Sequence, residues 1–222
     1  PPRRLTLFNG SPRGRKGNTP VLLEQFATGF CSIPGRSAEI YHLIALRQLA
    51  ERVQDFANAE CAWIGFPLYA DAMPASVKAF FEALQPLAGR PGNPPVGFLV
   101  QSGFPESVHS RHVEQYLERL AGRLGSPYLG SSLKGGCEGT RLMPEKMNKR
   151  LFRALQQLGR GLANHGRLEP GLLAQVARPE YCPSILVPVF KLLIRTSIFS
   201  FYWDRKLKQN GAYEKRFDRP YG

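Results

Sequence analysis

The sequence of 222 residues predicts an α/β domain: a doubly wound parallel sheet of five strands with helices on both faces. Two observations support this fold class. Strand and helix patterns alternate five times over the first 165 residues, and most of the strand patterns are near-continuous apolar runs, as in strands buried on both faces. A chain of this length can bury a substantial core and still carry an appended segment.

Five β–α units follow one another along the chain. Apolar or alternating runs predict strands at residues 4–10, 37–43, 60–69, 94–103 and 127–136. Helical spacing of apolar residues predicts helices at residues 19–33, 45–56, 73–87, 110–125 and 143–166. In the first helix Thr19 is the expected N-cap and Pro20 the first helical residue, while Gly125 is expected to end the fourth.

Residues 166–222 break this alternation, so we expect the domain to span residues 1–165 and a helical extension to span residues 166–222. A short helix between turns is expected before residue 183. The following segment, 183–203, is apolar but contains Lys191 and Arg195, which disfavour a membrane-spanning helix. Three interpretations stay open: the segment packs on its own domain or on a dimer partner, forms a lid over a ligand site, or lies in a membrane interface.

Positive charge is concentrated in the second half of the chain. The net charge is +13, of which +2 falls in residues 1–110 and +11 in residues 111–222. Such a distribution indicates a polyanionic partner, which could be a phosphorylated cofactor, an anionic membrane surface or a nucleic acid, or else only a basic solvated surface. No nucleic-acid-binding motif is present, so we expect no nucleic-acid partner.

The cysteines give no sign of a metal site or a disulfide framework. They lie at positions 31, 61, 137 and 182, and no two have the spacing of metal ligands. The first residues, "PPRRLTLF", lack the apolar run and cleavage site of a signal peptide. We therefore expect reduced cysteines, no bound metal and a cytoplasmic protein.

Parallel sheets bind ligands beyond the carboxyl ends of their strands, which directs attention to the loops at residues 10–19, 66–73 and 102–108. The first loop, "GSPRGRKGNT", lies between a strand and a helix and combines glycines, neutral donors and cations. Backbone amides at a helix N-terminus, with Arg13 nearby, suit an anion. The loop matches neither the P-loop nor the Rossmann spacing, and a solvated surface turn is the alternative.

Three segments together resemble the family of NADPH-dependent FMN reductases and flavodoxin-like NAD(P)H oxidoreductases. "GSPRGRKGNT" resembles the phosphate loop of that family, "GFPLYADAMPASVKAFFEAL" its second flavin-binding segment and "QSGFPES" its third. They follow the first, third and fourth predicted strands, in the order of the family. The resemblance covers roughly residues 4–165 and implies a flavodoxin-like sheet of strand order 2-1-3-4-5.

The resemblance also implies which residues contact FMN. The phosphate would lie on Ser11, Arg13, Asn18 and Thr19; the ring would be lined by Pro67, Leu68, Tyr69 and Met73; and its pyrimidine edge would meet Ser102, Gly103 and Phe104. Glu106 and His109 are polar residues of the third segment, for which proton donation competes with a capping or surface role. The related iron–sulfur flavoproteins carry a compact cysteine motif that this sequence lacks, so no cluster is implied.

By this resemblance the chain would be an FMN-dependent oxidoreductase that takes hydride from NAD(P)H at flavin N5 and reduces a small acceptor. The acceptor would be a quinone, a nitro or azo compound, or a flavin, and the family suggests a homodimer. Two alternatives stay open: a non-enzymatic electron carrier like flavodoxin, and a quinone reductase at a membrane surface that uses residues 183–203. No catalytic side chain is implied, because the chemistry would be that of the flavin.

Overall fold

A computed structural model describes residues 1–69, 71–182, 188, 203–205 and 207–219. The chain divides into two compact units, Pro1–Tyr181 and Cys182–Gly222. The strands of the first unit are β1 (Arg4–Asn9), β2 (Ser37–His42), β3 (Ala62–Pro67), β4 (Val96–Gln101) and β5 (Tyr128–Lys134). Its helices are α1 (Asn18–Cys31), α2 (Leu49–Ala57), α3 (Ala75–Ala83), α4 (Arg111–Leu124), α5 (Glu145–His165) and α6 (Pro170–Val176), with short 3-10 turns at Gly14–Lys16, Leu46–Gln48, Gln85–Leu87 and Ser107–Ser110.

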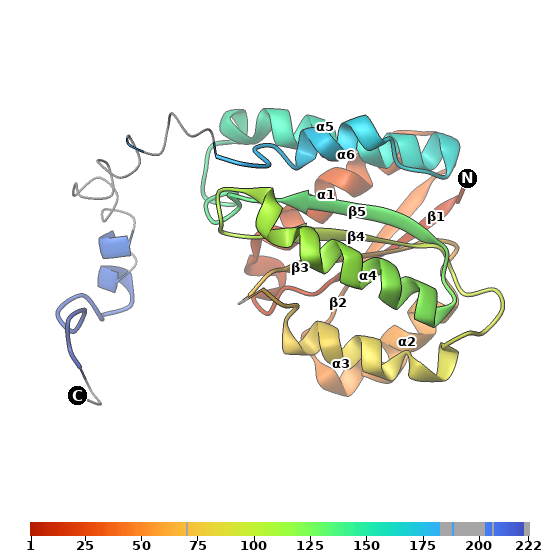
Figure 1. Ribbon diagram of the computed structural model, residues 1–222, viewed down its shortest axis with the longest axis horizontal. Helices are drawn as coiled ribbons and strands as arrows, with labels where there is room; N and C mark the ends of the chain where they lie inside the picture. Colours follow the sequence, from red (N-terminus) through yellow and green to blue (C-terminus); the bar gives the residue numbers. More distant parts are fainter. Residues whose placement is uncertain (70, 183–187, 189–202, 206, 220–222) are drawn as a thin grey trace. The chain divides into compact units, whose positions relative to one another are not determined.

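All five strands are parallel and pair in the order β2-β1-β3-β4-β5 (Figure 1), which confirms the predicted fold class. A helix carries the chain back between consecutive strands, so every strand runs in the same direction. All the loops that follow strands therefore lie at one edge of the sheet, the carboxyl edge. The order reverses between β1 and β3, and this reversal places the loops after these two strands at the topological switch point.

Side chains of β1 alternate between two separate cores. Leu5 and Leu7 pack with α1, α5 and α6 on one face of the sheet, whereas Phe8 packs with α2, α3 and α4 on the other. All three side chains are buried. This is the expected period of two for a strand covered on both faces, and Figure 1 shows the two helical layers on opposite sides of the sheet.

Helices α1 and α5 make a close contact through two glycines. A Cβ atom at Gly29 would lie 1.9 Å from the carbonyl oxygen of Gln156, and one at Gly159 would lie 2.0 Å from that of Phe26. The two backbones therefore meet without a side chain between them.

Two expectations about helix boundaries change. The N-cap of α1 is Gly17 and the helix starts at Asn18, so the prediction of Thr19 as the N-cap is wrong. The reason is the extended backbone of Gly17, which lets the helix begin two residues earlier. The short helix expected after residue 166 is α6, and it lies in the compact unit that ends at Tyr181, beyond the expected boundary at residue 165. The division into an FMN-binding domain and an extension stays a prediction.

The second unit is described at residue 182, residue 188 and within residues 203–219. Within it the guanidinium of Arg216 lies 3.9 Å from the ring centre of Tyr213, and the amine of Lys208 lies 4.6 Å from the same ring. Nearly all of the apolar segment 183–203 falls outside the described residues, so its three interpretations stay predictions. Within the described part of the chain, we find no helix with the length and hydropathy needed to cross a membrane.

Candidate functional site

The turn between β1 and α1 is organised by Asn9, the last residue of β1. Its buried side-chain amide donates to the carbonyl oxygen of Gly14 (3.2 Å) and lies 2.8 Å from Nδ1 of His42, while its oxygen accepts from the backbone N–H of Ser11 (3.1 Å). The sequence interpretation missed this residue. The available signal was a polar side chain that ends a buried strand, because a buried amide needs several partners and therefore fixes its surroundings.

Two glycines allow the same turn to close on itself. Gly14 has a φ of +54°, a conformation that favours glycine. A Cβ atom at Gly17 would lie 2.3 Å from Oγ of Ser11, which is itself buried. The turn is therefore a tight cradle of backbone around the Ser11 hydroxyl, at the start of α1.

The N-terminus of α1 has the character of an anion site. Gly17 provides no side-chain cap, and the first backbone N–H groups of a helix have no partner within the helix. Arg13, Arg15 and Lys16 in the preceding turn are exposed. Partial positive charge at the helix end and these cations together favour a phosphate or carboxylate group at this position.

The side chains of Asn18 and Thr19 are engaged within the protein. The amide nitrogen of Asn18 donates to the carbonyl oxygens of Cys137 (2.6 Å) and Glu138 (3.1 Å), and its oxygen accepts from the backbone N–H of Arg141 (3.1 Å). The hydroxyl oxygen of Thr19 accepts from the side chain of Gln101 (3.3 Å). Phosphate contact by these two residues stays a prediction, and their backbone amides are the groups that the structure leaves for it.

The second predicted segment follows β3 and forms a narrow loop. Pro67 and Leu68 are buried, and Tyr69 is 48% exposed. Tyr69 and Ala72 exchange two backbone hydrogen bonds of 2.9 and 3.0 Å. Met73 is partly buried against the core under α3. Of the four residues predicted to line a ring, Tyr69 thus presents the most side-chain surface, whereas Leu68 belongs mainly to the core.

The third predicted segment follows β4. Ser102 is buried, and its hydroxyl has no hydrogen-bond partner among the described residues. Gly103 follows it, and Phe104 is 46% exposed with its ring 5.0 Å from that of His109. A ring nitrogen of His109 lies 3.1 Å from a carboxylate oxygen of Glu106. The Ser102 hydroxyl is therefore free to bond a polar group of a ligand at this loop.

Gln101, the last residue of β4, joins the three segments. Its backbone oxygen accepts from the N–H of Leu68 (2.8 Å), its side-chain amide donates to Thr19 (3.3 Å), and Ser102 follows it in the chain. The structure thus brings the first, second and third predicted segments to one place at the carboxyl edge. A glutamine at the end of an apolar strand was the available signal, but its partners lie in other loops.

Burial controls the charge state of groups at this edge. Burial lowers the pKa of His42, with a smaller contribution in the same direction from Arg15, so the imidazole beside Asn9 is favoured in its neutral form. Burial also raises the pKa of the Cys137 thiol to about 11. Cys137 is therefore a protonated, buried thiol. The described residues include no group of three or more His, Cys, Asp or Glu side chains placed to hold a metal ion.

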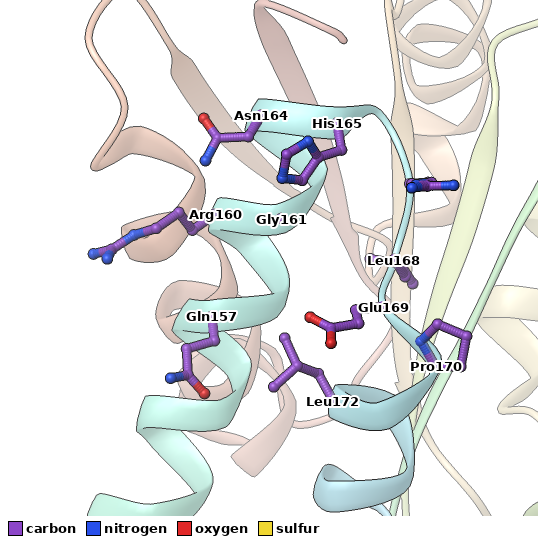
Figure 2. A pocket seen from close by; sticks show the side chains of 10 residues that line it. Gln157, Arg160, Gly161, Asn164, His165, Leu168, Glu169, Pro170 and Leu172 are labelled. Atoms are coloured by element: carbon purple, nitrogen blue, oxygen red, sulfur yellow. The ribbon is translucent and has the colours of Figure 1, made fainter.

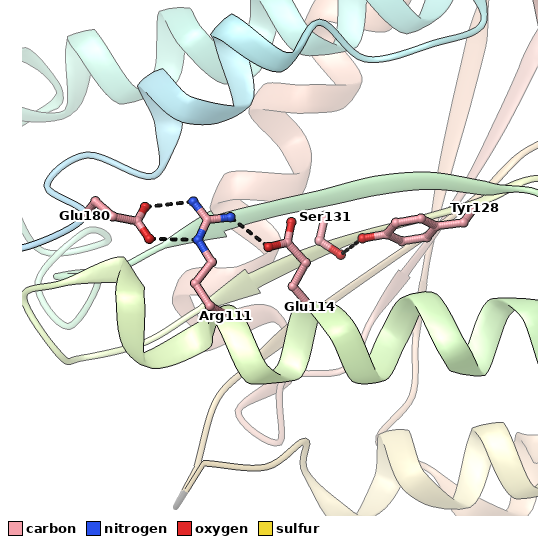
Figure 3. A network of polar contacts seen from close by, with 5 residues as sticks. All are labelled: Arg111, Glu114, Tyr128, Ser131 and Glu180. Atoms are coloured by element: carbon pink, nitrogen blue, oxygen red, sulfur yellow. Dashed lines mark hydrogen bonds and ion pairs between the residues drawn. The ribbon is translucent and has the colours of Figure 1, made fainter.

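The third segment is also contacted by residues 179–180, which follow α6 in the chain. The backbone N–H groups of Ser107 and Val108 donate to the carbonyl oxygens of Pro179 (3.1 Å) and Glu180 (3.2 Å). Arg111 donates two bonds of 2.7 Å to the carboxylate of Glu180 and one to Glu114 (Figure 3). The bonds from Arg111 lower the pKa of Glu180, and together with the backbone bonds they hold the loop after β4 in place.

A cavity of about 830 Å³ lies elsewhere, between α5 and α6. Figure 2 shows Gln157, Asn164 and His165 on α5 and Glu169 at the start of α6 around it. None of its lining residues belongs to a loop that follows a strand. It is therefore separate from the convergence of loops at Gln101.

Comparison with known proteins supports the fold. A solved NADH:FMN oxidoreductase matches with a TM-score of 0.55 at 19% identity, over 80% of this chain and 96% of its own. An NAD(P)H:quinone oxidoreductase from Methanothermobacter marburgensis matches with a TM-score of 0.59 at 15% identity, over 74% of this chain and 99% of its own. An FMN-dependent NADH-azoreductase from Bacillus anthracis, solved with FMN, matches with a TM-score of 0.55 at 13% identity, over 73% of this chain and 100% of its own. These matches show the flavodoxin-like fold. No protein-family model and no curated protein matches the chain.

Proposed function

We propose that this chain is an FMN-dependent oxidoreductase that accepts hydride from NADH or NADPH and reduces a small acceptor such as a quinone, a nitro or azo compound, or a flavin. The observation that carries the proposal is the convergence of three loops at Gln101, directly beside the uncapped N-terminus of α1. Solved proteins of the same fold that are described as FMN-dependent reductases add support.

The residues present fit a flavin mononucleotide. The Gly17 cradle and the free amides of α1 suit a phosphate, with Arg13 close in the chain to add a forked charge-assisted contact. The unpartnered hydroxyl of Ser102 and the backbone of Gly103 suit the polar edge of a ring, and the exposed face of Tyr69 suits its apolar surface. FMN would supply the hydride and electron chemistry when bound.

In this proposal the chain binds FMN, orients its ring and shields it from water. Backbone amides near Ser102 would stabilise negative charge at the ring edge, because fixed donors there need no reorganisation. Asn9 and Gln101 are positioning residues, since each holds a loop rather than a ligand. Glu106 and His109 form a hydrogen-bonded pair beside Phe104, and proton transfer to the acceptor by this pair is part of the proposal.

Binding of FMN by the first turn is tested with Arg13→Gln. Titration of FMN into the apo protein, followed by flavin fluorescence, should show about 10–100-fold weaker binding, because a charge-assisted hydrogen bond contributes about 1.5–3 kcal/mol. Arg90→Gln removes the same charge at an exposed position after α3 and should leave the affinity unchanged. Equal affinity of the two variants would remove Arg13 from the proposed site.

Oxidation of NADH and NADPH by the FMN-loaded protein, with and without a quinone, separates an enzyme from an electron carrier. Acceptor-dependent oxidation supports the reductase. Stable FMN binding without oxidation of either nicotinamide would instead favour a carrier like flavodoxin, and a protein that takes up no FMN would exclude both. Homodimer formation, a cytoplasmic location and a membrane-surface role for residues 183–203 stay predictions.

A further inference from the structure

One face of α5 is a continuous stripe of exposed cations. The stripe, called here the α5 basic face, consists of Lys146, Lys149, Arg150, Arg153 and Arg160. Their spacing of three and four residues places them on one side of the helix. Phe152, Leu155 and Leu158 occupy the other side and are buried against the sheet and α1. The face is therefore solvent-exposed along most of a helix of 21 residues.

Few carboxylates lie beside this face. Within the described ranges no carboxylate forms an ion pair with any of its five cations. Glu145 is the single acidic residue of α5, at its first position. In α6, which packs beside α5, the acidic residue is Glu169 at the N-cap, and it lines the same cavity as Arg160. Gln175 of α6 lines a shallow groove together with Lys146 and Met147. The face thus presents net positive charge to its surroundings, concentrated at Lys146, Lys149, Arg150 and Arg153.

Apolar side chains project from the loop and first turn beside these cations. Leu142 is 61% exposed, Met143 is 44% exposed and Met147 is 64% exposed. All residues from 141 to 147 are exposed, so this apolar tip has no cover among the described residues. Three large aliphatic side chains in such a short stretch are unusual on a surface that faces only water.

We propose that the tip at Leu142, Met143 and Met147, together with the α5 basic face, binds the surface of a lipid bilayer that contains anionic lipids. Aliphatic side chains inserting between headgroups, flanked by lysine and arginine, are the combination that interfacial binding requires. A second copy of this chain fits less well, because two basic faces would repel each other. A nucleic acid would use the cations but would give the aliphatic tip no contact.

The position of the tip has a consequence for the first turn. The backbone N–H of Arg141 donates to Asn18, and its guanidinium donates to the carbonyl oxygen of Arg15 (2.7 Å). The tip is therefore fastened to the turn that precedes α1, so a bilayer bound at the tip would lie close to the candidate site. Lipid binding itself does not depend on the proposed function, because apo and FMN-loaded protein carry the same surface.

The test is co-sedimentation of the full chain with vesicles of phosphatidylcholine containing 30% phosphatidylglycerol, and with vesicles of phosphatidylcholine alone. The triple variant Lys146→Gln, Lys149→Gln, Arg150→Gln should bind the anionic vesicles about a hundredfold more weakly, at roughly fivefold per cation. The matched control, Arg90→Gln, Arg119→Gln, Arg123→Gln, removes the same charge from exposed positions on α4 and after α3, and should lose less than about threefold.

A second variant, Leu142→Ser with Met143→Ser, tests insertion without changing charge and should also weaken vesicle binding, by about tenfold or more. All substituted residues are exposed, and thermal unfolding checks that each variant is folded. Three results would overturn the proposal. The α5 triple variant and the control triple variant could lose vesicle affinity equally, the wild type could bind neutral vesicles as well as anionic ones, or the serine variant could bind as tightly as the wild type. Displacement from vesicles by an equal charge concentration of duplex DNA would overturn it in favour of a general polyanion site.

Discussion

The close contact between α1 and α5 predicts that Gly159→Ala destabilises the protein. The added Cβ atom would lie 2.0 Å from the carbonyl oxygen of Phe26 and 2.8 Å from the backbone nitrogen of Phe30, whereas ordinary contact begins at about 3.4 Å. Both of these atoms belong to helix backbone and cannot rotate away. The two helices must therefore move apart by more than 1 Å, which is a form of overpacking.

The magnitude follows from two opposing terms. Overpacking of this kind costs about 1–3 kcal/mol, and a rigid backbone contact lies near the upper end of that range. Replacing glycine by alanine in a helix returns about 1 kcal/mol through helix propensity. We therefore expect Gly159→Ala to lower the free energy of unfolding by about 2 kcal/mol relative to the wild type.

Gly161 provides the matched control in the same helix. The nearest heavy atom to a Cβ built there is the carbonyl oxygen of Arg167, at 3.9 Å, so Gly161→Ala should stabilise the protein by up to about 1 kcal/mol. Urea unfolding of both variants, followed by circular dichroism, should separate them by about 3 kcal/mol with unchanged m-values. If Gly159→Ala were as stable as Gly161→Ala, the reasoning from helix contact would be refuted.

Two further predictions concern titratable groups. Hydrogen bonds from Arg4 and from two backbone N–H groups lower the pKa of Glu60 to about 2, so its contribution to stability is present above its usual pKa of 4.5 and is lost as the pH falls toward 2. Unfolding measurements should therefore show that the wild type loses more stability than Glu60→Gln over this range; equal losses would contradict the assignment. Burial raises the pKa of Cys61 to about 12 and that of Cys137 to about 11, whereas Cys31 is exposed. At neutral pH a thiol reagent should label Cys31 in the native protein but should reach Cys61 and Cys137 only after denaturation, and rapid native labelling of either would show that it is accessible.

Most of the fold could be predicted because it depends on local patterns. Apolar strands such as Ala62–Pro67 and helical spacing in Arg111–Leu124 reflect burial that each segment requires on its own. Parallel sheets bind ligands beyond the carboxyl ends of their strands, and this rule located the ligand loops without knowledge of any contact. The N-cap of α1 was predicted two residues too late because Gly17 adopts an extended conformation that its neighbours do not reveal.

Contacts between distant segments could not be predicted in this way. Asn9 and Gln101 each look like an isolated polar residue in the sequence, and their roles depend on partners in other loops. The bond between Arg111 and Glu180 joins residues 69 positions apart, and neither position shows a local pattern. The same holds for Gly29 and Gly159. Helix propensity alone predicts only that each glycine destabilises its own helix, and it does not predict their contact.

The pairing of α1 with α5 also affects how the chain can fold during synthesis. Helix α1 ends at Cys31, but its partner begins only at Glu145. At about 5–20 residues per second, the ribosome needs on the order of ten seconds to add the residues between them. During that interval the buried side of α1, with Phe26 and Phe30, has no α5 to cover it. A nascent chain of this protein thus exposes this apolar surface until α5 is synthesised, and translational pausing before residue 145 would lengthen that exposure.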